Sequence, residues 1–170
     1  MKLFAVYVGG DIKGANIELH DMRFVIGASI GQTYDELRQQ WWGTPSSLHV
    51  DCWAELNHAD GYAIHLKKEP FIGPEKLFYV NLGGYEEDEF TEMHKNMFVV
   101  AETEAKAKIR ALKTVRHWRA FHKDDIYQAD QAFSLNSQAR EHGLYIHLEK
   151  TDEDTPLSFV CNYTKIGRKA

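Results

Sequence analysis

The sequence has little of what would identify a function directly. Among its 170 residues no apolar run approaches the roughly 18 that a membrane-spanning helix requires, and a glycine pair interrupts MKLFAVYVGGDIKG too early for a signal peptide. Positive charge is not in excess either, because the formal net charge is −5 and the pI is about 6.0. Nucleic-acid-binding proteins that contact the phosphate backbone usually carry a basic face. We therefore expect a cytoplasmic protein that binds neither DNA nor a membrane.

Cysteine and known catalytic motifs are also scarce. The two cysteines, Cys52 and Cys161, stand far apart and neither belongs to a C-x-x-C motif. They indicate neither a zinc knuckle nor a disulfide framework, so we expect two reduced thiols. The chain has no H-E-x-x-H or G-x-G-x-x-G motif. An enzyme is therefore not the leading expectation.

The sequence does contain an internal repeat. Shifted by 74 residues, KLFAVYVGG (2–10) aligns with KLFYVNLGG (76–84), and the alignment runs without a gap until residue 26 meets residue 100. Ten of these 25 pairs are identical, where chance would give about one or two. We interpret this as a duplication, with a first repeat at 1–68, a linker at 67–75, a second repeat at 76–150 and a C-terminal extra strand and tail at 151–170.

The pattern of each repeat predicts an α+β fold. Two strands, a helix and two more strands follow one another, which indicates tandem β-β-α-β-β units, each with one helix over a small sheet in the manner of a β-grasp-like roll. The apolar run LFAVYV is typical of a central strand covered on both faces. A unit of roughly 70 residues can bury only a marginal core. We therefore expect the two units to pack together with pseudo-twofold symmetry.

Four local predictions accompany this architecture. SLHVDCWAEL and GYAIHLKK are expected to pair as the final hairpin of the first repeat. AFSLNSQAREH, where the second repeat carries roughly nine extra residues, is expected to be a loop. The pair Gly9-Gly10 is expected to end a strand in a turn with positive φ. A helix capped by Thr103 is expected to bury a stripe made of Ala105, Ile109, Leu112 and Val115.

Few polar residues recur in both repeats. Apart from lysines and glycines there are five pairs: Glu18/Glu92, His20/His94, His49/His122, Asp51/Asp124 and His65/His147. The spacings E-x-H and H-x-D put both side chains of each pair on one face of an extended strand. If the strands are neighbours, the first repeat brings two carboxylates and two imidazoles together. Such a group is ligand chemistry for a divalent transition metal, or a carboxylate–imidazole arrangement for proton transfer.

The candidate metal ligands are therefore Glu18, His20, His49 and Asp51, with Glu92, His94, His122 and Asp124 as the second-repeat equivalents. The main alternative is structural, because a histidine that donates to a carboxylate also satisfies the polar groups of a buried strand. His65 and His147, each flanked by Ile and Leu, are expected to face solvent rather than a metal.

The motifs resemble a small bacterial family catalogued as domain of unknown function 1543. The resemblance is carried by KLFAVYVGG, IELHDMRFVIGAS, and WWGTP followed by LHVDCW and GY. It covers nearly all of the first repeat and, more loosely, the second. It implies a bacterial cytoplasmic origin and a tandem architecture, and it implies no activity, cofactor or catalytic residue.

The second repeat departs from these motifs. Lys95 follows the histidine in place of Asp21, and Val115-Arg116-His117 replaces W-W-G. The first repeat is therefore the better equipped for chemistry.

Three functions remain open from the sequence. The leading one is a non-enzymatic tandem module that binds a small molecule or a protein partner, with a homo-oligomer among the alternatives. The second is a metal-dependent enzyme that uses the Glu/His/His/Asp group. The third, a role on RNA or the ribosome, rests only on fold analogy, and the acidic charge disfavours it.

Overall fold

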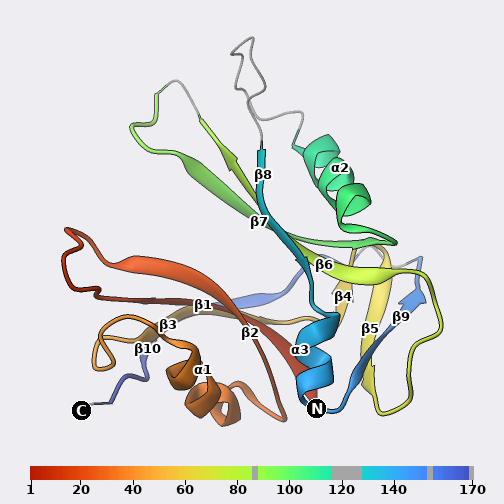
Figure 1. Ribbon diagram of the computed structural model, residues 1–170, viewed down its shortest axis with the longest axis horizontal. Coiled ribbons are helices and arrows are strands. Elements are labelled where there is room, and N and C mark those ends of the chain that lie inside the picture. The colour runs from red at the N-terminus through yellow and green to blue at the C-terminus, as the bar shows by residue number, and fades with distance from the viewer. Residues whose placement is uncertain (86–87, 116–127, 153–154, 169–170) are drawn as a thin grey trace.

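The computed structural model describes the chain apart from residues 86–87, 116–127, 153–154 and 169–170, and its fold is α+β with three antiparallel sheets and few helices (Figure 1). The strands are β1 (Lys2–Gly10), β2 (Leu19–Gly27), β3 (His49–Glu55), β4 (His58–Ala59), β5 (Tyr62–Lys67), β6 (Lys76–Gly84), β7 (Met93–Ala101), β8 (Gln128–Ser134), β9 (Tyr145–Lys150) and β10 (Phe159–Lys165). The helices are the 3-10 turn η1 (Ile30–Thr33), α1 (Tyr34–Gln40), α2 (Glu104–Thr114) and α3 (Asn136–Glu141). No helix among the described residues is long and apolar enough to cross a membrane.

The strands form what we call the first, second and joining sheets. The first sheet has the order β10-β3-β1-β2, the second β7-β6-β8 and the joining sheet β4-β5-β9. The order β2-β1-β3 in the first sheet matches β7-β6-β8 in the second. The central strand of each also carries a register shift at the same place, Tyr7/Val8 in β1 and Asn81/Leu82 in β6.

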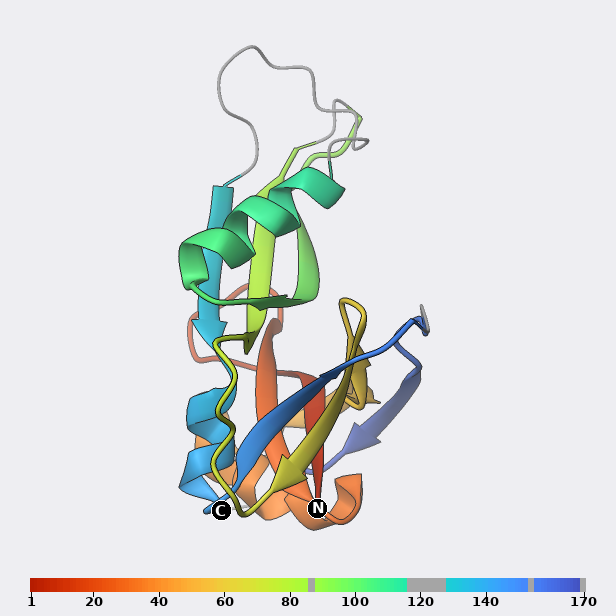
Figure 2. The same cartoon turned by 90° about the vertical axis from the view of Figure 1, so that its right-hand side faces the viewer.

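The central strand β1 is covered on both faces, as its apolar sequence predicts. Phe4, Val6 and Val8 are buried with Leu37 of α1 on one face, while Leu3 belongs to the cluster shared with the other two sheets. The helix α2 covers the second sheet in the same way, with β6, β7 and β8 all in contact with it. Figure 2 shows α2 lying across that sheet, with the first and joining sheets below it.

Two local expectations are wrong and a third is right only in part. β3 and β5 do not form a hairpin: β3 pairs with β1, while β5 pairs with β9 of the second half of the chain. The segment expected as a loop contains the end of β8 and the helix α3, whose Ala139 is buried in the shared core. Thr103 does cap α2 by accepting from the Lys106 N–H, but the helix buries Ala107 and Ala111 rather than Ala105 and Ile109.

A disulfide joins Cys52 of β3 to Cys161 of β10, so the expectation of two reduced thiols is wrong. The two residues are 109 positions apart, but they face each other in register across neighbouring strands, with Cα atoms 4.2 Å apart. The extra strand predicted for the C-terminal tail is therefore present as β10. It forms an edge of the first sheet and is covalently tied to it.

Candidate metal centre

Four polar side chains, three on β2 and β3 and one from the residue just before β2, meet on one face of the first sheet. His20 on β2 and His49 on β3 lie opposite the same residue of β1, Gly9, from its two sides. Glu18 precedes His20 by two residues and Asp51 follows His49 by two, so the period of the strands puts all four on the same face. We call Glu18, His20, His49 and Asp51 the His–carboxylate cluster. The four residues predicted from the first repeat are thus brought together.

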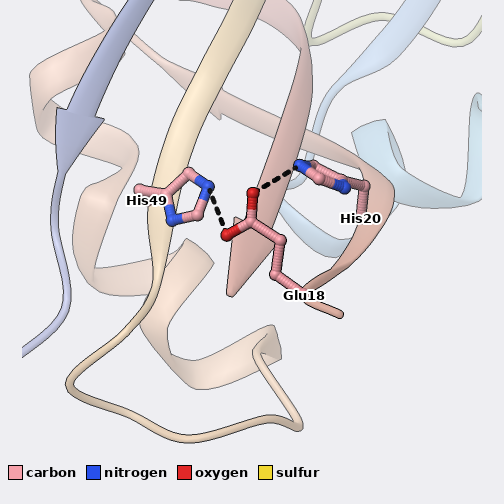
Figure 3. Close-up of side chains that lie close together, drawn as sticks. All are labelled: Glu18, His20 and His49. Carbon is pink, nitrogen blue, oxygen red and sulfur yellow. Dashed lines mark ion pairs between the residues drawn. The ribbon is translucent and has the colours of Figure 1, made fainter. Parts of the chain in front are cut away.

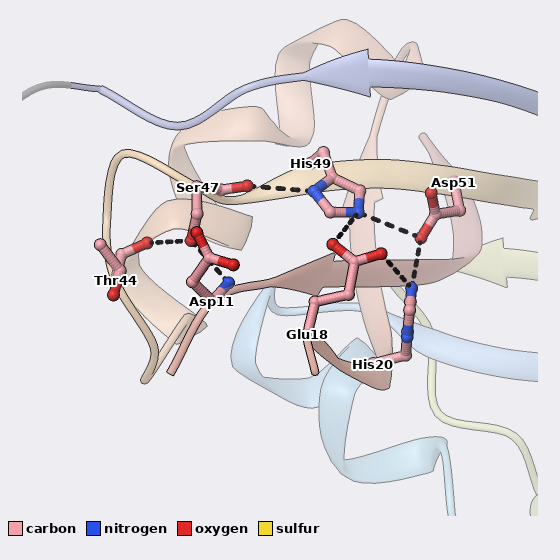
Figure 4. Close-up of polar contacts among 7 residues, drawn as sticks. All are labelled: Asp11, Glu18, His20, Thr44, Ser47, His49 and Asp51. Atoms are coloured by element: carbon pink, nitrogen blue, oxygen red, sulfur yellow. Dashed lines mark hydrogen bonds and ion pairs between the residues drawn. The ribbon is translucent and has the colours of Figure 1, made fainter. Parts of the chain in front are cut away.

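The nitrogen and oxygen atoms of the cluster converge (Figures 3 and 4). His20 Nε2 lies 3.5 Å from Glu18 Oε1 and 3.2 Å from Asp51 Oδ2. His49 Nε2 lies 3.7 Å from Glu18 Oε2 and 3.5 Å from Asp51 Oδ2. One ligand atom each from Glu18, His20 and His49 can be chosen so that all lie within 4.8 Å of one another.

The tautomer of His49 follows from its surroundings. Its Nδ1 lies 3.0 Å from the Ser47 carbonyl oxygen, which can only accept, so Nδ1 carries a proton (Figure 4). A neutral His49 therefore presents a lone pair at Nε2 toward the carboxylates. The hydrogen bond from His49 Nδ1 to the Ser47 carbonyl is typical of the outer hydrogen bonds of metal-binding histidines. Ser47 is itself held in place, because its hydroxyl accepts from the Asp11 N–H at 2.8 Å and donates to the Thr44 carbonyl at 2.8 Å.

Two atoms of the cluster are buried without a hydrogen-bond partner among the described residues. These are His49 Nε2 and Asp51 Oδ2. The side chain of His49 is only 4% exposed. An unpaired buried polar atom costs roughly 1–3 kcal/mol, and structures rarely leave one unexplained.

Gly9 makes the approach of the two imidazoles possible. A Cβ at Gly9 would lie 2.6 Å from His49 Nε2 and 2.7 Å from His20 Cδ2. Gly9 and Gly10 continue β1 to its end, and neither is among the residues with positive φ, so the expected turn is wrong. The physical reason for glycine at position 9 is space between the rings rather than backbone freedom. Its recurrence in both repeats was the signal that could have revealed this.

Two tyrosines frame the cluster, and sequence reasoning missed both. Tyr163 of β10 lies against His49 with ring centroids 4.6 Å apart, and Tyr7 of β1 stacks on His20 at 5.2 Å. Burial, together with the carboxylates of Asp51 and Asp21, raises the pKa of Tyr7. No local pattern indicated Tyr163, because the disulfide-linked strand β10 brings it to the cluster from the far end of the chain.

The second repeat does not reproduce the cluster in the part of the chain that the structure describes. His94 Nε2 lies 3.7 Å from Glu92 Oε2, and its Nδ1 lies 3.1 Å from Asn81 Oδ1. The remaining candidates, His122 and Asp124, lie outside the described residues.

The paired histidines His65 and His147 face each other between β5 and β9 of the joining sheet, away from the strands of the cluster. His65 is about half exposed, whereas His147 is partly buried and its Nε2 lies 2.7 Å from the Glu69 carbonyl oxygen. The expectation that both face solvent therefore fits His65 better than His147.

Comparisons with known proteins identify a family and are silent on the reaction. A family model described as Domain of Unknown Function (DUF1543) matches residues 15–66, a span that contains the whole cluster. The solved structure described as that of a protein Il1583 from Idiomarina loihiensis is 34% identical and aligns over 99% of each chain with a TM-score of 0.73. No curated protein matches the chain.

Proposed function

Because the chain belongs to the family of Domain of Unknown Function (DUF1543), whose description names no activity, we propose its function from the His–carboxylate cluster. The chain binds one divalent transition-metal ion, of which Zn²⁺ is the simplest case, through Glu18, His20, His49 and Asp51. Two imidazoles with two carboxylates suit Zn²⁺ and its first-row neighbours better than Mg²⁺ or Ca²⁺, which prefer oxygen ligands alone.

One observation carries this proposal. A neutral His49, whose Nδ1 donates to the Ser47 carbonyl, presents a lone pair at Nε2 toward two carboxylates whose oxygens also present only lone pairs, and both His49 Nε2 and Asp51 Oδ2 lack a hydrogen-bond partner among the described residues. Such an arrangement is repulsive unless positive charge lies between the groups. A divalent cation supplies that charge and accepts from every member of the cluster at once.

The spacing of the ligand atoms supports the same proposal. Zn²⁺ binds nitrogen and oxygen at about 2.0–2.2 Å, and the corners of a tetrahedron of that radius are roughly 3.3–3.6 Å apart. The four nitrogen–oxygen separations in the cluster are 3.5, 3.2, 3.7 and 3.5 Å. These four separations are close to the edges of such a tetrahedron, and the ligand atoms of Glu18, His20 and His49 all lie within 4.8 Å of one another.

The test is metal content followed by titration. We expect untagged protein to carry one ion per chain by mass spectrometry of the metal, and chelated protein to take up one Zn²⁺ by calorimetry. At free Zn²⁺ 100-fold above Kd, thermal unfolding should show a stabilisation of about 2.7 kcal/mol. His20→Gln should abolish uptake, whereas the matched change His65→Gln on the joining sheet should not affect it.

The competing explanation is a purely structural network, in which a protonated imidazole bridges the carboxylates. The two explanations differ in the metal-free protein. A network predicts that Asp51→Asn destabilises the fold, because Asp51 would lose an ion pair with His20. A metal site predicts that the same change does not destabilise the metal-free protein, because it removes the charge of a carboxylate that faces the lone pair of a neutral His49. No bound metal, together with a destabilised Asp51→Asn variant, would refute the metal proposal.

With four protein ligands the ion is enclosed, as in structural sites, which favours a non-enzymatic binding module. A metal-dependent enzyme is the second candidate, and the observation that favours it is a pocket of about 500 Å³ lined by His20. A catalytic ion keeps three protein ligands and an open position, which would leave Asp51 as an acid–base group. In that case Asp51→Ala retains the ion, whereas four-fold protein ligation predicts that it is lost.

We also infer that the two halves of the chain descend from one β-β-α-β-β unit. The matching strand orders β2-β1-β3 and β7-β6-β8, the register shifts at equivalent places and the Glu92–His94 pair support this inference. Because β5 pairs with β9 across the halves, neither half should fold alone. A stable, cooperatively unfolding fragment of residues 1–74 would contradict the exchange of strands between units.

A further inference from the structure

The disulfide between β3 and β10 lies directly beside the His–carboxylate cluster. Cys52 is the next residue of β3 after the proposed ligand Asp51. Its partner Cys161 comes shortly before Tyr163 in β10, and the ring of Tyr163 packs against His49 with ring centroids 4.6 Å apart. One covalent bond therefore joins the strand that carries two of the cluster residues to the strand that covers one of them.

Strand pairing is irregular at Asp51 on both sides of β3. The register of β3 with β1 passes from Cys52 to Val50 and leaves Asp51 without a partner. The register with β10 skips Asp51 as well, and it leaves out Asn162 and Tyr163 of β10. Bulged residues of this kind lie outside the regular ladder, so their position depends on the neighbours that are fixed. The disulfide fixes the neighbour of Asp51 on one strand and the neighbour of Asn162 on the other.

The first half of β10 depends on this bond more than the second half does. β10 is an edge strand, and Phe159 and Val160 are 64% and 43% exposed, so their side chains contribute little packing. The residue after the strand, Ile166, is buried, and its carbonyl oxygen accepts from Arg38 Nε at 2.7 Å. Breaking the disulfide should therefore loosen the strand around Cys161 without detaching its far end.

The disulfide is accessible to a reagent in solution. Cys161 is exposed and Cys52 is partly buried. Both cysteines line a groove of about 380 Å³, whose apolar lining includes Trp53 and Phe159. Exposed disulfides are in general the more easily reduced ones, and they include regulatory and catalytic bonds. A thiol can therefore reach the sulfur of Cys161 while the protein remains folded.

We propose that Cys52 and Cys161 form a reversible thiol–disulfide exchange site, and that this site sets the affinity of the neighbouring cluster for its ion. The regulation rests on the proposed metal function, whereas the exchange itself does not.

The co-reactant of the exchange is a dithiol. One of its sulfurs attacks Cys161 as a thiolate and forms a mixed disulfide, while Cys52 leaves as a thiolate and takes up from water the proton that the reagent lost. The second thiol of the reagent then attacks the mixed disulfide and releases Cys161 in the same way. The dithiol is thereby oxidised to a disulfide by two electrons, and both cysteines of the protein are reduced.

The oxidised protein is the form that holds the ion more tightly. With the bond in place, Tyr163 packs on the ring of His49 and the backbone at Asp51 is fixed, so two of the four ligands are held in position. Loss of such outer support typically lowers the affinity of a metal site by about 10–100-fold. Because the far end of β10 stays attached, we expect the lower limit, a Kd for Zn²⁺ that rises roughly tenfold on reduction.

The first experiment tests the exchange on the metal-free full chain. Folded protein is incubated with dithiothreitol as a small dithiol or with reduced thioredoxin as a protein dithiol, and free thiols are counted by alkylation and mass spectrometry. We expect both cysteines to become alkylated without denaturant, and oxidised dithiothreitol to restore the bond. The reagent that acts at the lower concentration identifies the source of the dithiol. A disulfide that is reduced only after urea unfolds the chain would overturn the inference.

The second experiment compares affinities for Zn²⁺ by calorimetry, without a reductant that would itself bind the ion. The double variant Cys52→Ser with Cys161→Ser represents the reduced form and lacks thiols that would take up Zn²⁺. We expect its Kd to be roughly tenfold above that of the oxidised parent. Asp60→Ala is the matched control, because it weakens the fold by removing the ion pair with Arg110 and touches no residue of the cluster, so its affinity should be unchanged.

Variants of Tyr163 separate its positioning role from general stability. Tyr163→Ala keeps the disulfide and removes the ring from His49, so it should weaken Zn²⁺ binding to a similar extent. Tyr163→Phe keeps the ring and should restore the parent affinity, which a loss of stability alone would not explain. Because these variants retain the disulfide, they test the mechanism even if the serine variant fails to fold.

The outcomes distinguish this inference from the proposed function. A parent protein that binds no Zn²⁺ would overturn the metal function and its regulation together, while the exchange would still be measured by alkylation. A parent protein that binds Zn²⁺, with the serine variant and Tyr163→Ala within twofold of its affinity, would overturn the regulation alone.

Discussion

Replacing Gly9 by alanine should abolish metal binding without unfolding the protein. Gly9 lies in register with both imidazole ligands, and the new methyl carbon would lie 2.6 Å from His49 Nε2 and 2.7 Å from His20 Cδ2. The backbone at Gly9 is not in the positive-φ region, so alanine is compatible with β1. The perturbation therefore acts on the two rings rather than on the chain.

The magnitude follows from these distances. Ordinary contacts of a Cβ begin at 3.4 Å, so the His49 ring must withdraw by the difference from 2.6 Å, about 0.8 Å. Metal–ligand distances tolerate only about 0.2 Å. We expect the Kd for Zn²⁺ to rise at least roughly 100-fold, equivalent to about 2.7 kcal/mol. The metal-free protein should change little, because the smaller entropy of the unfolded chain contributes about 0.4–1 kcal/mol that offsets the crowding.

The assay is calorimetric titration of chelated protein with Zn²⁺, with circular dichroism to verify that each variant is folded. Gly31→Ala is the matched control, since a Cβ there meets nothing within 4 Å. A folded Gly9→Ala variant that binds Zn²⁺ within twofold of the parent would refute the reasoning. It would mean that the rings are not ligands, or that the strands move apart more easily than the register implies.

Three further predictions concern the fold. Reducing the Cys52–Cys161 disulfide, or replacing both residues by serine, should lower the free energy of unfolding by about 2–4 kcal/mol in urea titrations; an unchanged midpoint would count against the bond. The contribution of Tyr79 to the free energy of unfolding should be fully present below pH 10 and decline toward pH 12, because its raised pKa disfavours the phenolate in the folded state. In unfolding curves recorded at alkaline pH, Tyr79→Phe should flatten this decline. Asp60→Ala removes the ion pair of Asp60 with Arg110 and a hydrogen bond from a backbone N–H of β7, so it should lower the free energy of unfolding by about 1–2 kcal/mol. A double-mutant cycle that shows no coupling between Asp60 and Arg110 would contradict a stabilising ion pair.

Much of the candidate site was predictable from spacing alone. Side chains two residues apart on a strand share a face whatever lies next to that strand, so E-x-H and H-x-D each specify a coherent pair. The duplication then selected these pairs from nine histidines and 25 acidic residues. Gly9 was singled out by the same repeat, but its role was misread because a glycine pair is locally typical of a turn.

The buried stripe of α2 shows where a local pattern fails. The predicted stripe is right at Leu112 and Val115, which pack in the core of the second sheet, and wrong at Ala105 and Ile109. The helix packs its small residues Ala107 and Ala111 against the second sheet, which allows a close approach, and leaves Ile109 about half exposed. Packing distance, which no single segment encodes, decided the orientation of this helix.

The α+β class, the covered strand β1, the repeated motifs and the membership of each polar pair can be read from the sequence. The fold of the whole chain was needed to reveal that β2 and β3 flank β1, that β5 pairs with β9, and that Cys52 meets Cys161. The physical reason is the separation in sequence over which each kind of interaction acts. Periodicity and turn chemistry act over a few residues, whereas strand partners are chosen by the burial of whole faces between segments that are up to 109 positions apart.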